Sequence, residues 1–147
     1  MMTSFRPATW ARLKADRSAA TAVEFTILAP LFLLLIMGMI SFGIYLAASH
    51  SLQQLAADAT RTAIAGVDSA ERRALASLFI ERNADAYPFI QRVHLVFDIA
   101  EDPLNPNQFT VTLRYDAHSL PVWAAMKGLP LPPAEMRRIS TIRMGGL

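Results

Sequence analysis

The stretch that decides the fold is RSAATAVEFTILAPLFLLLIMGMISFGIYLAAS, residues 17–49. After Arg17 its only charged side chain is that of Glu24. An apolar helix needs about 20 residues to span the hydrocarbon core of a bilayer. Phe25–Ala48 exceeds that length, so the stretch predicts a membrane-spanning helix.

The charges on either side of this helix predict its orientation. The residues before it are basic, whereas Arg61 is the only basic residue between Ser49 and Val67. Positive loops stay in the cytoplasm, which places the N-terminus inside and the following domain outside. A cleaved secretory signal is the alternative, but its apolar core is typically about 7–15 residues, much shorter than this one. The basic residues of the leader are Arg6, Arg12, Lys14 and Arg17.

Composition limits the chemistry of the remaining residues. The chain has 147 residues, a net charge of +2 and no cysteine, which excludes disulfides, thiol catalysis and cysteine-ligated metals. The positive charge comes from the leader, so we expect no nucleic-acid-binding surface in the domain. We predict a basic cytoplasmic leader at 1–19, a transmembrane helix at 20–49 and an extracytoplasmic domain at 50–147.

Helical periodicity continues past the apolar stretch. In SLQQLAADATRTAIAG the apolar residues recur at spacings of three and four, and Gly66 is a typical stop. Asp68 followed by Glu71 resembles a capping box and predicts a second helix that ends at Pro88. The apolar side of the first helix comprises Leu52, Leu55, Ala59 and Ala63, and that expected for the second comprises Leu75, Leu78, Phe79 and Arg82.

The pattern then changes to strict alternation, which is typical of strands with one buried face. Residues 93–99 and 109–115 alternate apolar and polar side chains on either side of a turn-rich segment, and 138–144 predicts a third strand. Two helices covering one face of about three antiparallel strands make an α+β domain. The inward residues expected are Val93, Leu95, Phe97, Ile99, Phe109, Val111, Leu113 and Tyr115.

Glu24 has two interpretations from position alone. Near a helix N-terminus a carboxylate gains roughly 0.3–1 kcal/mol from the macrodipole. Alternatively it awaits a cation from another chain, because ionisable residues within membrane helices usually have a function.

The residues around Glu24 resemble a known family. Ala19-Ala20-Thr21-Ala22-Val23-Glu24-Phe25 is similar to the processing region of the type IV pilin superfamily, and residues 17–63 resemble the opening of TadE-like pseudopilins. The resemblance extends to the hairpin, the Pro- and Leu-rich turn and the last strand. It implies a minor pilin-like subunit needed to assemble a Tad (type IVc, Flp) pilus.

The resemblance also implies a processing site and partners. A prepilin peptidase would cut between Ala19 and Ala20, leaving Glu24 as the fifth mature residue and Phe25 as the sixth. Glu24 would neutralise the new amine of Ala20 on a neighbouring subunit. Other pilins and pseudopilins, the membrane and the inner-membrane assembly platform would be the partners. The family typically has glycine before the cut, where this chain has Ala19.

Other candidate sites are weaker. Gly43 and Ala47 form a small-xxx-small pair that lets helices approach closely. Asp98, Glu101, Asp102, Asn105 and Asn107 do not follow the spacing of a calcium loop, and His50, His94 and His118 lie far apart in sequence. We therefore expect no metal, cofactor, catalytic residue or small-molecule substrate. The alternative function is an unprocessed, membrane-anchored envelope protein that binds another component; a tethered enzyme lacks any supporting motif.

Overall fold

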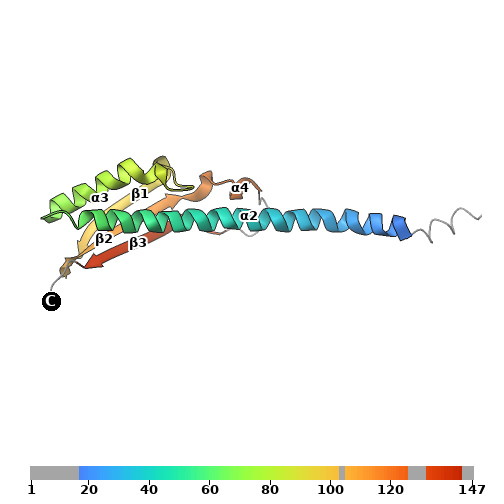
Figure 1. Ribbon diagram of the computed structural model, residues 1–147, viewed down its shortest axis with the longest axis horizontal. Helices are drawn as coiled ribbons and strands as arrows, with labels where there is room; N and C mark the ends of the chain where they lie inside the picture. Colours follow the sequence, from blue (N-terminus) through green and yellow to red (C-terminus); the bar gives the residue numbers. More distant parts are fainter. Residues whose placement is uncertain (1–16, 103–104, 126–131, 144–147) are drawn as a thin grey trace, which may run out of the picture. The chain divides into compact units, whose positions relative to one another are not determined.

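The computed structural model describes residues 17–102, 105–125 and 132–143, with side chains described for 21–101, 108–123 and 132–143. The chain divides into two compact units, Met1–Met39 and Ile40–Leu147. A single helix, α2 (Arg17–Ala63), has residues in both (Figure 1). The predicted limits at residues 19 and 49 concern the peptidase and the membrane, and they remain predictions.

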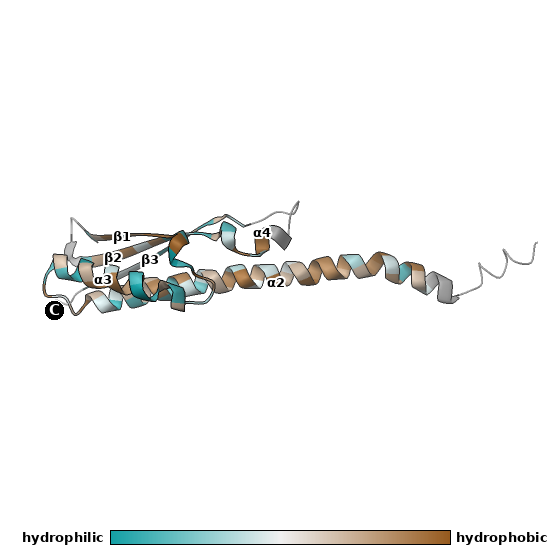
Figure 2. Cartoon of the chain, turned by 90° about the horizontal axis from the view of Figure 1, so that it is seen from above, coloured by the Kyte–Doolittle hydropathy of each residue, from teal (hydrophilic) through white to brown (hydrophobic). Residues whose placement is uncertain are grey.

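The described part of the first unit is the N-terminal part of α2. The helix continues through Pro30, and the Thr26 hydroxyl donates a hydrogen bond of 2.7 Å to the Ala22 carbonyl. Many of its large apolar side chains are exposed, and Figure 2 shows the apolar residues of this part of α2 in brown. No described residue of this unit covers them.

The second unit is a two-layer α+β structure, as predicted. One layer holds α2 from Ile40 onward and α3 (Ser69–Asn83); the other is an antiparallel sheet in the order β1-β2-β3 (Figures 1 and 2). The strands are β1 (Leu95–Asp102), β2 (Asn105–Asp116) and β3 (Glu135–Arg143). Short helical turns are η1 (Ala84–Ala86), η2 (Arg92–His94), η3 (Ala117–Ser119) and α4 (Val122–Ala125).

The core lies between these layers and uses the residues that the alternation selected. The predicted α2 stripe is buried, as are the inward residues of β2. Val93 is exposed, because the chain at that point is the η2 turn and β1 begins only at Leu95. Trp123 packs against this core, and its indole N–H donates to the Ala117 carbonyl. The central buried residues are Leu52, Leu55, Ala59, Ala63, Phe109, Val111, Leu113 and Tyr115.

The start of α3 matches the prediction, but its buried face and its end do not. Asp68 accepts a hydrogen bond of 2.8 Å from the Glu71 amide, and the Glu71 carboxylate accepts one of 2.8 Å from the Val67 amide. Ala76 and Ile80 are buried, whereas Leu78, 46% exposed, lies toward solvent. Small alanines let α3 lie close to the sheet, so the contact face is turned away from the bulkier Leu78. The α-helix ends at Asn83, before Pro88, because η1 continues with tighter turns.

The side chain of Arg72 ties the helix junction to the sheet. Its Nε donates to the Gly66 carbonyl at 3.1 Å and its Nη2 to the Val67 carbonyl at 3.2 Å. Its Nη1 lies 3.6 Å from Glu101 Oε1 on β1, which is close enough for an ion pair but too long for a hydrogen bond. Arg72 therefore stabilises the loop between α2 and α3 and fixes its position relative to β1.

Side chains of α2 hold the outer edge of β3. The Tyr45 hydroxyl donates to the Pro133 carbonyl at 3.2 Å, and the Gln53 amide donates to the Ile139 carbonyl at 3.3 Å. Arg138 donates to the Ser49 hydroxyl between them. Residue numbers rise together along both elements, so this part of α2 and β3 run in the same direction.

The third strand starts earlier than predicted. β3 begins at Glu135 instead of 138, and its pairing with β2 reaches Asp116↔Glu135. The Ala117 amide donates to the Ala134 carbonyl at 2.8 Å, which extends the pairing just beyond the strand. The register therefore brings residues 135–137, which precede the predicted strand, beside the end of β2.

Candidate functional site

The predicted processing and assembly residues all lie in α2. Ala19 and Ala20 are helical, in the turn that follows the helix start at Arg17. Glu24 and Phe25 follow on the same helix and are exposed, Phe25 by 70%. Ala20 and Glu24 are four residues apart, which places them on one side of a helix. The structure thus puts the two groups of the predicted ion pair one turn apart along the axis.

Glu24 is a charged group on an otherwise apolar surface. Val23, Ile27 and Leu28 around it are all exposed, and within the described part of the chain no side chain forms an ion pair with the Glu24 carboxylate. Burying a carboxylate in an apolar environment is costly unless it is paired and hydrogen-bonded. The carboxylate is therefore free for a cation from elsewhere.

An apolar groove follows Glu24 on the same helix. It has a volume of about 640 Å³ and is lined by carbon-rich side chains between Phe25 and Leu35. Because one helix forms it, the groove is a surface between ridges of side chains, the kind of surface into which a neighbouring helix packs.

Gly43 and Ala47, farther along α2, differ in how far the described chain covers them. A Cβ added at Gly43 would meet nothing within 4 Å, so no described part of the chain packs closely on it. Ala47 is half-buried beside the buried Ala48. The role of Gly43 and Ala47 in packing against another helix remains a prediction.

The hydropathy of α2 agrees with a membrane span. Between Thr21 and Ala63 its most apolar window has a mean hydropathy of 2.5, and 6% of that window is buried. By length and composition this helix can cross a membrane, a property shared by signal sequences. An unburied apolar helix of this length needs a covering of lipid or of other helices.

Comparison with known families identifies this segment. Residues 19–61 match the family model described as TadE-like protein. Over these residues the chain matches the TadE-like family. The matched TadE-like segment contains Ala20, Glu24, Phe25, Gly43 and Ala47, and it confirms the resemblance inferred from the sequence. No curated protein and no solved structure matched the chain.

The family match points to a broad class of function. TadE-like pilin proteins are generally structural and not catalytic, and the family suggests a role related to Tad pilus assembly. The TadE-like segment ends at Arg61, so the sheet lies outside the match. Function in the second unit must therefore be argued from its own residues.

Of the residues considered for calcium, the two with described side chains, Asp98 and Glu101, do not converge. Asp98 and Glu101 lie on opposite faces of β1, since side chains alternate along a strand and Glu101 points toward Arg72. The side chains of Asp102, Asn105 and Asn107 lie outside the described residues. Among the described side chains, no group of three or more His, Asp or Glu could hold a metal ion.

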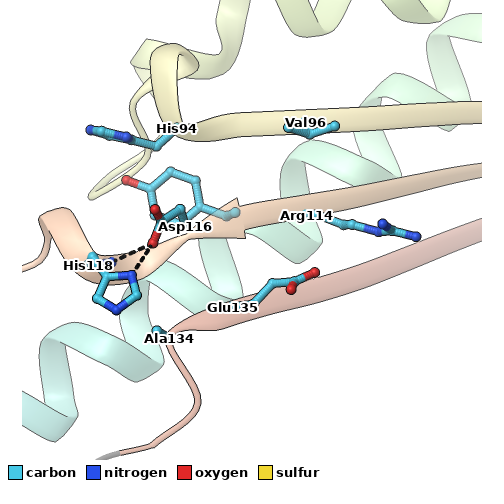
Figure 3. Close-up of a pocket in the computed structure, with 8 residues that line it drawn as sticks. His94, Val96, Arg114, Asp116, His118, Ala134 and Glu135 are labelled. Atoms are coloured by element: carbon cyan, nitrogen blue, oxygen red, sulfur yellow. Dashed lines mark hydrogen bonds and ion pairs between the residues drawn. The ribbon is translucent and has the colours of Figure 1, made fainter.

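The structure brings together two histidines that are distant in sequence. His94 and His118 line one pocket of about 410 Å³ at the end of the sheet (Figure 3). His118 donates to Asp116 from its backbone amide at 3.0 Å, and its ring Nδ1 lies 2.7 Å from the same carboxylate oxygen. These bonds from His118 lower the pKa of Asp116, so the carboxylate stays ionised. The spacing of the histidines in the sequence did not predict this pocket, because the pocket forms only where the end of β2 pairs with residues 134–135.

Proposed function

We propose that this protein is a minor pilin-like subunit of the bacterial inner membrane that is required for assembly of a Tad pilus. The observation that carries the proposal is Glu24, which no described side chain pairs, in the N-terminal part of the matched TadE-like segment, where the large apolar side chains Val23, Ile27 and Leu28 around it are exposed. A structural role suits such a helix, because its exposed surface is suited to lipid and to other helices and offers no catalytic group.

The proposed mechanism is noncovalent assembly after processing. A prepilin peptidase removes the leader between Ala19 and Ala20 on the cytoplasmic side. The new α-amine on Ala20 is cationic at neutral pH. Glu24 of a neighbouring subunit pairs with it, and the low dielectric of the membrane makes this attraction much stronger than it would be in water. The pair fixes the axial register of adjacent helices.

The apolar helix and the outer domain then have separate tasks. Gly43 and Ala47 allow close packing of neighbouring helices, and the platform in the inner membrane recruits the subunit. The positive leader keeps the N-terminus in the cytoplasm and the α+β domain in the periplasm. The domain contacts other pseudopilins there.

One observation favours a second function. Ala19 stands where the family typically has glycine. If the peptidase rejects alanine, no amine forms on Ala20 and the protein acts as an unprocessed, anchored interaction protein of the envelope. In that case Glu24 is dispensable.

Replacement of Glu24 tests the proposal directly. Glu24→Ala removes the carboxylate and makes the helix more apolar, so membrane insertion and protein level should stay normal. We expect pili to be lost, as counted by electron microscopy and by immunoblot of sheared pilin.

The matched control is Thr26→Ala on the same helix, which removes only the local bond to the Ala22 carbonyl. Normal piliation with Glu24→Ala at wild-type protein level would refute the pairing role. Normal piliation in a strain that lacks the protein would refute the function as a whole.

A further inference from the structure

The sheet has one face that the helices do not cover. We call it the open sheet face; it lies opposite α2 and α3. Alternation along the strands places Val96, Arg114 and Arg137 there, and Figure 3 shows Val96, Arg114 and Glu135 on three adjacent strands with α2 behind them. The other side chains that alternation places there are Asp98, Ala100, Gln108, Thr110, Thr112, Asp116, Glu135, Ile139, Thr141 and Arg143.

At one end of this face, four charged side chains are arranged in two rows of opposite sign. Asp116 pairs directly across from Glu135, and two residues along the strands Arg114 pairs directly across from Arg137. Like charges directly opposite each other in antiparallel strands destabilise a sheet. Among the described residues no ion pair neutralises Arg114 or Arg137. Direct cross-strand pairing therefore does not explain the rows.

The surface around Arg114 is hollow and partly apolar. The pocket of about 410 Å³ and a second of about 270 Å³ are both lined by Val96 and Arg114, so they lie on either side of these residues. Val96 is 67% exposed and Ile139 is 46% exposed. A protein surface placed here meets aliphatic side chains and guanidinium groups together, a combination that suits a carboxylate-bearing partner.

A second copy of this chain does not fit the open sheet face. The C-terminal part of α2 runs in the same direction as β3, and copies anchored in one membrane point α2 the same way. Two such copies placed face to face would align equivalent rows, setting Arg114 and Arg137 against their own counterparts. Like-charge juxtaposition across an interface is strongly unfavourable.

We propose that the open sheet face binds a different protein of the same assembly. That partner presents a carboxylate to Arg114 and Arg137 and a cation to Asp116 and Glu135. The inference rests on the proposed function, which places the protein and its partner in the same pilus assembly. It makes the protein a subunit of a heteromeric complex. Charge complementarity in both rows sets the partner's register along the strands.

Site-specific crosslinking of the full-length chain in piliated cells tests the inference. A photo-crosslinking residue replaces Val96, and the other pilin-like and assembly proteins of the cell carry an affinity tag one at a time. We expect an adduct with one tagged protein. Arg114→Glu with Arg137→Glu should reduce that adduct by about tenfold or more, because the two new glutamates repel the partner's carboxylate. The milder pair Arg114→Gln and Arg137→Gln should give a smaller loss, which separates charge from misfolding.

The matched control is Arg73→Glu with Arg82→Glu, which makes the same charge change on exposed positions of α3 and should leave the adduct unchanged. An adduct containing two copies of this chain, no adduct with any tagged protein, or an adduct insensitive to both arginine pairs would overturn the inference. The proposed function is judged separately by deletion. If deletion of the protein abolishes pili but the Arg114/Arg137 variants still form the adduct normally, the proposed function stands and only the inference about the open sheet face is overturned.

Discussion

At the scale of single residues, Gly66 shows what a residue type predicts and what only packing explains. Glycine after an apolar helical run correctly predicts the end of α2. The reason that glycine is needed there lies six residues on, where Arg72 closes over it: a Cβ at Gly66 would lie 2.7 Å from the Arg72 amide nitrogen and 2.8 Å from its Cγ. No sequence pattern indicates that contact.

Gly66→Ala should therefore destabilise the second unit. The backbone of Arg72 must move, which weakens its bonds to the Gly66 and Val67 carbonyls, and overpacking of this kind costs about 1–3 kcal/mol. The free energy of unfolding of the full chain in detergent micelles measures the effect.

Gly43→Ala is the matched control, since a methyl group there enters open space and alanine favours helix by about 1 kcal/mol. Equal stability changes in the two variants would contradict the role assigned to Gly66.

Glu24 differs from Gly66, because the sequence alone indicated why it is unusual. Its position in an apolar run was visible in the sequence, and the structure adds that no described side chain satisfies it. Arg114 and Arg137 were not predictable as a pair. Each lies in a different strand, and their juxtaposition depends on the β2–β3 register.

At the scale of elements, periodicity was informative where side chains alternate strongly. β1 and β2 bury the predicted faces, because only one register of the strands buries all of the apolar side chains of β2. These side chains are Phe109, Val111, Leu113 and Tyr115. The start of β3 was missed because the prolines before Glu135 favoured a loop. The α3 face was misassigned because small Ala76 is buried in preference to the larger Leu78. Hydrophobicity alone does not indicate how closely two elements approach.

The side chains that hold β3 offer a test at this scale. Gln53→Ala removes the amide that donates to the Ile139 carbonyl, and we expect a loss of about 0.5–1.5 kcal/mol in unfolding free energy. Edge carbonyls without such a donor are also open to pairing with other chains.

Gln54→Ala, an adjacent and exposed position with no hydrogen bond of its own among those described, should leave stability unchanged. Thermal unfolding of the two variants side by side makes the comparison. If both behave alike, α2 does not protect the edge of β3.

At the scale of the whole molecule, one helix serves two environments. The first part of α2 exposes apolar side chains, and its last part buries Leu52, Leu55 and Ala59 beneath the sheet. The family match includes residues of both parts and ends at Arg61, before the sheet. Sequence predicted this division because the charge and apolar patterns change along the helix. The partner of the open sheet face could not be predicted, since it depends on tertiary pairing.

The central claim is that the chain is processed to begin at Ala20, so that Glu24 meets an amine. Intact-mass spectrometry of the protein purified from piliated cells measures this most directly, with cells lacking the prepilin peptidase as the control. The account predicts a mature chain that starts at Ala20 in the first strain and keeps its leader in the second. A chain that still carries its leader in cells with active peptidase would contradict it.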